Sequence, residues 1–269
     1  SSDLMHKVRT RAQAERSGLV LGSDIDALRA APADQVLAMN KTIEGGRRML
    51  LRQPVLRPIL DGWSLDRDER EAYESGAFQA VPTIIGNTPD EAFGRLVADI
   101  PVKTPAELRA YLEQAFGDAT DEAWKFYGAK NDDGVMRGLA DAWSDDLYSY
   151  GVRGVAREMA KRQPKTFRYL FAHVGTHTYD PPRHDNDMTY AFGSGDFEPR
   201  DRAVSDTMIE RVGRFAVTCD PNGPGSPAWA PYDPARDNYL RFDEGWKQDA
   251  GFHTAQVDFL DRFYREQQA

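Results

Sequence analysis

Apolar residues recur at helical spacing over most of this chain. In residues 24–50 and 135–163 the apolar positions fall three or four residues apart, and the same spacing returns after Ser205 and over residues 254–267. This period places apolar side chains on one side of an α-helix. We therefore predict helices over these ranges, with Ser205 as an N-cap. A further helix is predicted to open at Thr104-Pro105-Ala106-Glu107, which combines a cap, a first-turn proline and a glutamate that reaches back.

Two short runs have the character of strands. Residues 81–86 are β-branched and apolar and end in glycine, and residues 166–171 are apolar and aromatic. Short runs without polar alternation are typical of buried strands in a parallel sheet. A two-stranded sheet is only marginally stable by itself. The pattern therefore predicts a helix-rich α/β chain that is part of something larger.

The charge balance excludes several classes of function. The chain has 43 acidic and 34 basic residues and a formal net charge of -9. Nucleic-acid binding needs clustered lysine and arginine, and anionic membranes repel an acidic surface. No apolar run approaches the roughly 18 residues that cross a bilayer. We therefore expect neither a nucleic-acid nor a membrane partner.

The single cysteine and the lack of glycine-rich motifs also limit which disulfides, metal sites and cofactors the chain can have. Cys219 is the single cysteine, so an intrachain disulfide and a cysteine-based zinc site are ruled out. One cysteine is compatible with either cytoplasm or periplasm. No glycine-rich dinucleotide or phosphate loop follows either predicted strand, and we expect no organic cofactor.

Candidate catalytic groups follow both predicted strands. Glu91 lies shortly after the first strand, and three of the five histidines, His173, His177 and His184, follow the second. A loop after a strand is a usual place for catalytic side chains because the sheet holds its base rigidly. A carboxylate and an imidazole in these places can form the orienting half of a nucleophile triad.

Each of these residues also has a plainer interpretation. Thr88-x-x-Glu91 repeats the capping-box pattern of Thr104-x-x-Glu107, and spacing alone favours capping for Glu91. Alone, His184 reads as a turn histidine bonded within its own loop. His173 and His177 could hold a metal ion together with His184 or Asp180. However, their spacing matches no known metal motif, so ordinary strand-end roles are favoured and no metal is predicted.

Three ordered blocks of sequence carry a family resemblance. They include Asn87-Thr88-Pro89-Asp90-Glu91, His184-Asp185-Asn186-Asp187 leading to Phe192-Gly193, and Phe215-Ala216-Val217-Thr218-Cys219-Asp220-Pro221-Asn222 followed by Trp229-Ala230-Pro231-Tyr232. Together with Pro58-Ile59-Leu60-Asp61-Gly62 upstream, these blocks resemble the type B carboxylesterases, the family of the cholinesterases and the bacterial para-nitrobenzyl esterases. The resemblance implies that Glu91 is the triad acid and His184 the catalytic histidine.

The chain departs from the family pattern at three positions. Ala92 and Cys219 stand where the family usually has glycine, and Asp185 replaces a small residue. Asp145 resembles the family's aspartate that precedes an aromatic residue.

The resemblance covers only the carboxyl-terminal half of the family's domain. No Gly-x-Ser-x-Gly elbow occurs in the chain, and no glycine-rich oxyanion loop precedes the acid. The resemblance therefore implies that residues 1–269 form the C-terminal portion of a single α/β-hydrolase domain. A second chain is expected to supply the nucleophile serine, the oxyanion hole and most of the sheet. The expected substrate is a small-molecule ester; the alternatives are a noncatalytic binding module of the same fold and a metal-dependent hydrolase.

Substrate-binding residues are suggested by position. Arg52 and Pro54 lie where the family lines its acyl pocket, and Arg95 follows the acid. Either arginine can pair with a substrate carboxylate, although surface roles are commoner. Phe93 is a candidate wall of the substrate gorge, as are Trp63, Trp143 and Tyr190, for which core packing is the default.

Overall fold

A computed structural model describes residues 5–43, 50–51, 57–94, 96–225, 227–244 and 246–267 of the chain. For residues 40–42 it gives the backbone alone. The chain divides into two compact units, Met5–Ala77 and Phe78–Ala269, and each is described by itself.

The first unit consists of short elements with little buried surface. Helices α1 (Arg11–Gly18) and α2 (Ile25–Ala30) contain no buried residue, and strands β1 (Arg9–Thr10) and β2 (Ile59–Leu60) form a short parallel pair. The predicted helices of residues 24–50 correspond to α2 and α3 (Ala33–Ile43), and residues 44–49 lie outside the described residues. The elements are β1 (Arg9–Thr10), α1 (Arg11–Gly18), η1 (Leu19–Leu21), α2 (Ile25–Ala30), α3 (Ala33–Ile43), β2 (Ile59–Leu60) and α4 (Glu69–Ser75).

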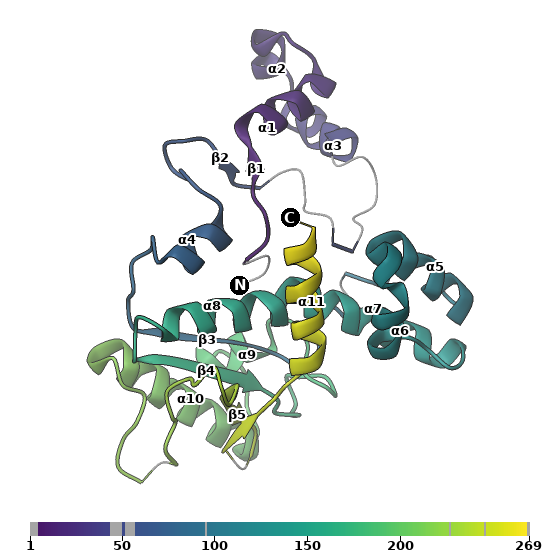
Figure 1. The fold of residues 1–269 in the computed structure, drawn as a ribbon. Coiled ribbons are helices and arrows are strands. Elements are labelled where there is room, and N and C mark those ends of the chain that lie inside the picture. The colour runs from purple at the N-terminus through teal and green to yellow at the C-terminus, as the bar shows by residue number, and fades with distance from the viewer. Residues whose placement is uncertain are drawn as a thin grey trace. The chain divides into compact units, whose positions relative to one another are not determined.

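The second unit contains the larger sheet and the longer helices (Figure 1). None of the described helices in either unit has the length and apolarity needed to cross a membrane. The elements of the second unit are β3 (Thr83–Asn87), α5 (Pro105–Phe116), η2 (Gly117–Ala119), α6 (Thr120–Tyr127), η3 (Asp132–Gly134), α7 (Val135–Ser144), η4 (Asp145–Ser149), α8 (Tyr150–Ala160), β4 (Thr166–Phe171), α9 (Asn186–Ala191), α10 (Pro199–Thr218), β5 (Asn238–Phe242), β6 (Lys247–Ala250) and α11 (Thr254–Glu266).

The sheet has four strands in the order β3-β4-β5-β6. The first three are parallel, and β6 is antiparallel to β5. The two predicted strands are present as β3 and β4, but the sequence analysis missed β5 and β6. Strand β6 reads Lys-Gln-Asp-Ala and is largely exposed, so it carries no apolar period and exists through its pairing with β5.

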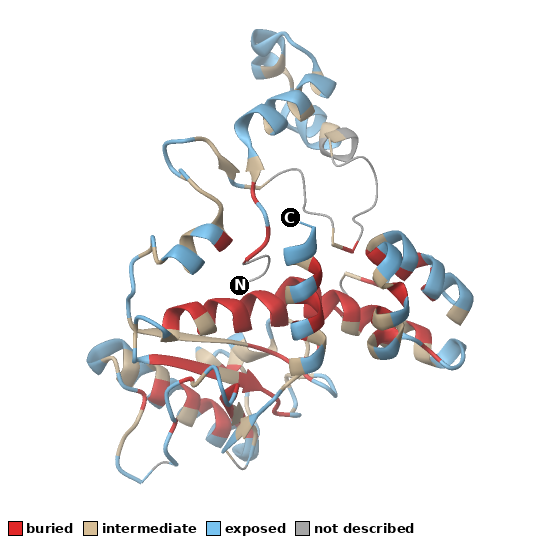
Figure 2. Cartoon of the chain, in the orientation of Figure 1, coloured by how far each residue is buried: buried red, intermediate tan, exposed pale blue. Residues whose placement is uncertain are grey.

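Helices cover both faces of this sheet, with α8 on one face and α10 on the other (Figure 1). One core cluster joins β4 and β5 to α9 and α10, and it contains Phe167, Phe171, Tyr190, Val204, Met208, Trp229, Leu240 and Phe242. Figure 2 shows buried residues concentrated along α8 and β4. This arrangement confirms the predicted helix-rich α/β class.

Two helix predictions need correction. The helix predicted over residues 135–163 is divided into α7, the π-helical turn η4 and α8. Ser205 is not an N-cap, because α10 begins six residues earlier with Pro199 in its first turn. Ser205 is buried inside that helix, and its hydroxyl donates to the carbonyl of Tyr190 at 2.8 Å.

Candidate active site

The loops that follow β3 and β4 leave the sheet at the same edge. The two strands are parallel, and Asn87 at the end of β3 is paired with Leu170 near the end of β4. Beyond the strands, Asp90 and Arg183 form an isolated parallel bridge, and the Asp90 N–H donates to Pro182 O at 3.2 Å. This bridge brings the residue after each of them, Glu91 and His184, to the same place.

Glu91 and His184 are directly hydrogen-bonded. Glu91 Oε2 lies 2.6 Å from His184 Nδ1, and Glu91 Oε1 accepts the Thr88 N–H at 2.6 Å. The Glu91 side chain is 6% exposed and that of His184 is 26% exposed. A carboxylate that holds Nδ1–H leaves Nε2 as the basic ring nitrogen. The pair therefore has the geometry of an oriented general base.

Glu91 forms only one of the two hydrogen bonds of a capping box. At α5 both halves of a capping box exist, since Thr104 Oγ1 accepts the Glu107 N–H and Glu107 Oε2 accepts the Thr104 N–H. At Glu91 only the second half exists, and residues 88–94 form turns and a bridge rather than a helix. The Glu91 carboxylate instead divides its two oxygens between the loop backbone and the imidazole.

Helix α7 holds the acid loop on both sides of Glu91. Arg137 donates to both carboxylate oxygens of the buried Asp90, at 2.9 and 2.7 Å. Ser144 Oγ accepts the Ala92 N–H at 3.0 Å. The residues before and after Glu91 are therefore fixed to the same helix, and this restricts where the carboxylate can point.

The histidine loop is supported by two tyrosines. The ring of Tyr148 lies 5.1 Å from that of His184, and Tyr169 in β4 donates its hydroxyl to Asp187 Oδ2 at 2.7 Å. Burial, with the charge of Asp187 next, raises the Tyr169 pKa well above its ordinary value, so the hydroxyl stays a donor. Gly86 makes room for this tyrosine, because a Cβ at that position would lie 2.4 Å from the Tyr169 ring.

The other ring nitrogen of His184 faces an exposed carboxylate. His184 Nε2 lies 3.2 Å from Asp185 Oδ1, and the Asp185 side chain is 66% exposed. Asp185 has a φ of 67°, in the left-handed region that favours glycine, asparagine and aspartate. Asp185 stands where the resembled family has a small residue, and it therefore places a negative charge beside Nε2.

Of the predicted substrate-binding residues, only Phe93 lies in the described part of the chain. Phe93 is half-buried next to the acid, with the guanidinium groups of Arg137 and Arg183 at 5.2 and 4.5 Å from its ring centre. Arg52, Pro54 and Arg95 lie outside the described residues.

Core packing, the default interpretation of the other aromatics, is confirmed for two of them. Trp143 and Tyr190 are buried core side chains, and a ring enclosed by protein offers no surface to a substrate. Trp63 is an exposed residue of the Met5–Ala77 unit.

The other two histidines of the strand-end segment have separate partners. His173 Nε2 lies 2.7 Å from Asp201 Oδ1, and His177 Nε2 lies 2.8 Å from the Asp196 carbonyl. Across the described ranges, no three histidine, cysteine or acidic side chains come together as a metal ligand set. The metal-dependent alternative therefore lacks a site in that part of the chain.

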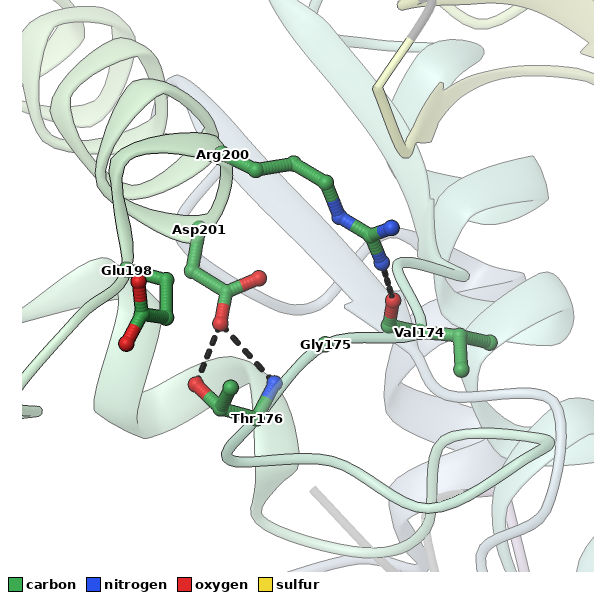
Figure 3. A pocket seen from close by; sticks show the side chains of 6 residues that line it. All are labelled: Val174, Gly175, Thr176, Glu198, Arg200 and Asp201. Atoms are coloured by element: carbon green, nitrogen blue, oxygen red, sulfur yellow. Dashed lines mark hydrogen bonds between the residues drawn. The ribbon is translucent and has the colours of Figure 1, made fainter.

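A pocket of about 450 Å³ lies beside Asp201 and includes neither Glu91 nor His184 (Figure 3). Two of its polar side chains have bonded partners: Asp201 Oδ2 accepts from the N–H and hydroxyl of Thr176, and Arg200 donates to Val174 O and pairs with Glu244, which lies outside the lining. The lining residues are Val174, Gly175, Thr176, Glu198, Arg200 and Asp201.

Sequence reasoning missed the residues that support the pair. Arg137, Ser144 and Tyr148 belong to the helix predicted over residues 135–163, which gave these three no role, and they reach the site through tertiary contacts. Arg183 had a usable signal, since a cation directly precedes the candidate histidine.

Comparison with known proteins is consistent with this geometry. The carboxylesterase family model matches residues 5–260. The fumonisin B1 esterase of Sphingopyxis macrogoltabida is 32% identical over 195 residues, which are 72% of this chain and 36% of that protein. The cocaine esterase of Homo sapiens is 25% identical over 246 residues (81% and 41%), and the acetylcholinesterase of Bungarus fasciatus is 24% identical over 211 residues (68% and 35%). The chain thus spans between 35% and 41% of the length of these relatives.

Proposed function

The chain belongs to the carboxylesterase family, and from this premise we propose that it supplies the acid and the base of a serine esterase. The observation that carries the proposal is the 2.6 Å hydrogen bond between Glu91 and His184, on loops at the same edge of the sheet. Pairing with a buried carboxylate fixes the tautomer and the direction of the imidazole.

In the proposed mechanism His184 Nε2 takes the proton of a serine hydroxyl as the serine attacks the ester carbonyl. The resulting imidazolium returns the proton to the leaving alcohol, and an acyl-enzyme remains. Water, deprotonated by the same nitrogen, then releases the acid product. Glu91 accepts the Nδ1–H bond throughout and stabilises the imidazolium. Asp185 must turn away from Nε2 when the serine hydroxyl takes its place, and its exposure permits this.

We also propose that a second polypeptide provides the serine, the oxyanion hole and further strands. This chain has no Gly-x-Ser-x-Gly motif, and it spans only part of its relatives. Among the described strands β3 has one neighbour, β4, so its outer edge is open for pairing. We expect a native, active preparation to yield a second polypeptide in intact-mass analysis. Active material consisting only of the 30.2 kDa chain would contradict this part of the proposal.

The triad roles are tested with Glu91→Gln and His184→Ala in the active esterase. We expect kcat on 4-nitrophenyl butyrate to fall by about 10³- to 10⁴-fold in each, because orientation or the base itself is lost. His177→Gln is the matched control, since His177 bonds a loop carbonyl. Esters related to fumonisin B1 are the first natural substrates to assay, given the relative that covers 72% of this chain. Near-normal turnover in either variant, with thermal unfolding unchanged, would remove the assignment.

A further inference from the structure

Arg183, next to His184 in sequence, is held between two aromatic rings. Its guanidinium carbon lies 4.5 Å from the ring centre of Phe93 and 4.0 Å from that of Tyr179. It also lies over Gly94, where an added Cβ would come within 3.3 Å of Nη1. Stacking of this kind orients a guanidinium group but leaves its N–H donors free for an anion.

Among the described residues no carboxylate lies within ion-pair distance of Arg183. Its Nε is buried and has no hydrogen-bond partner there. The nearby acids are already engaged: Asp90 pairs with Arg137, and Glu91 and Asp185 lie against the two nitrogens of His184. A half-buried cation without a counter-ion is costly, and an anionic ligand relieves that cost.

Arg137 is the informative contrast, because it lies over the same Phe93 ring. It contacts Asp90 and Asp141, both at 2.7 Å, so its charge is neutralised within the protein. The two arginines therefore have similar aromatic contacts and opposite charge environments. Arg137 holds the acid loop, whereas the charge of Arg183 remains available.

We propose that Arg183 is a specificity-determining residue that binds a carboxylate of the substrate, so that the enzyme prefers esters bearing a second, free acid group. This inference rests on the proposed esterase function and deepens it. The expectation of an acidic substrate was first attached to Arg52 and Arg95; Arg183 supplies a described residue beside the pair. A planar guanidinium with unused donors suits bidentate recognition of a carboxylate.

The test compares matched neutral and acidic esters in the active enzyme. One pair carries the charge on the acyl side: 4-nitrophenyl hexanoate and the 4-nitrophenyl half-ester of adipic acid. The other carries it on the alcohol side: phenyl butyrate and 4-carboxyphenyl butyrate. We expect Arg183→Gln to lower kcat/KM for the acidic member of at least one pair by about 10- to 100-fold, mainly through KM. The neutral members should stay within about twofold, because Arg183 bridges to Asp90 through its backbone, which the glutamine variant keeps.

Two variants serve as controls. Arg202→Gln removes an exposed arginine that lies 5.0 Å over Phe197, away from the pair, and should change neither class of ester. Arg183→Lys keeps the charge and should restore part of the acidic-ester activity. Equal losses on acidic and neutral esters, or no loss on either, would overturn the inference. Failure of the wild-type enzyme to cleave either class of ester, or normal cleavage by His184→Ala, would instead overturn the proposed function.

Discussion

Two of the histidines that follow β4 are each bonded to a carboxylate. The two pairs differ in their surroundings rather than in bond length. Glu91–His184 measures 2.6 Å and His173–Asp201 measures 2.7 Å. The His173 and Asp201 side chains are 1% and 2% exposed, whereas His184 is 26% exposed. A short bond to a carboxylate therefore does not identify a catalytic histidine. The exposure of the imidazole separates the two pairs.

The difference follows from where each histidine leaves the sheet. His173 comes two residues after β4 and still packs among core rings, with the ring centre of Tyr190 at 5.3 Å. Its partner Asp201 belongs to α10 and also accepts the Thr176 N–H, at 2.8 Å. This pair joins the end of β4 to α10 and is structural. His184 comes later, on a loop that stays at the sheet edge through the bridge to Asp90.

Exchanging the two histidines for glutamine should give opposite results. His173→Gln leaves Asp201 buried without its ring partner, and we expect a loss of about 3 kcal/mol in the free energy of unfolding. His184→Gln should cost less than about 1 kcal/mol, because its loop is partly exposed. Turnover per folded molecule should be near normal in the first and nearly absent in the second. Denaturant unfolding and kcat on 4-nitrophenyl butyrate measure the two quantities.

The comparison fails if His173→Gln abolishes turnover while the protein remains folded. It also fails if His184→Gln is the more destabilising substitution, since His184 would then be a structural residue.

The pH dependence of stability tests whether the charge of Asp201 makes the His173–Asp201 pair stabilising. Burial opposes ionisation of this carboxyl, but hydrogen bonds from Thr176 and His173 outweigh it and lower its pKa from 3.8 to about 2. A lowered acid pKa contributes stability that is present above pH 3.8 and is lost as the pH falls through about 2. We expect the stability advantage of the wild type over Asp201→Asn to shrink by about 2 kcal/mol between pH 5 and pH 2. A difference that does not vary with pH would show that the charge of Asp201 contributes nothing.

The sequence predicted that Glu91 and His184 form a pair, but it did not predict the residues that support them. Glu91 and His184 could be found because each lies soon after a recognisable buried strand and within a block that resembles a known family. The neighbours that hold them, Arg137 and Tyr148, lie 46 and 57 residues after the acid in the sequence and act only after α7 and η4 pack. That Arg183 has no counter-ion among the described residues is likewise a property of the packed structure.

Local pattern also failed where tertiary contacts decide the outcome. The same Thr-x-x-Glu spacing caps α5 at Thr104 but is followed by a bridged loop at Thr88, where the backbone of Asp90 forms a β-bridge with that of Arg183. Strand β6 lacks an apolar period and depends on β5. Cys219 illustrates the opposite case. It stands where the resembled family has glycine, and its φ of 58° is the left-handed geometry that glycine usually provides.

A third pair, His253–Asp145, tests whether exposure alone marks the catalytic histidine. Its bond is 2.7 Å, and the His253 side chain is 26% exposed, like that of His184. It differs in place, because it joins the start of α11 to η4 rather than the loops after β3 and β4. Burial lowers the His253 pKa, but the hydrogen bond and charge of Asp145 outweigh this and raise it above 6.5.

A raised histidine pKa contributes stability that is fully present below pH 6.5 and is lost as the pH rises through the folded-state value. We therefore expect His253→Gln to cost about 1 kcal/mol in the free energy of unfolding at pH 5.5 and less at pH 9, with turnover unchanged at both. Unfolding curves and kcat at the two pH values measure this. A collapse of turnover in folded His253→Gln would mean that exposure beside a carboxylate is enough to identify a functional histidine. Unchanged turnover would mean that position at the sheet edge is required as well, since the two imidazoles are equally exposed.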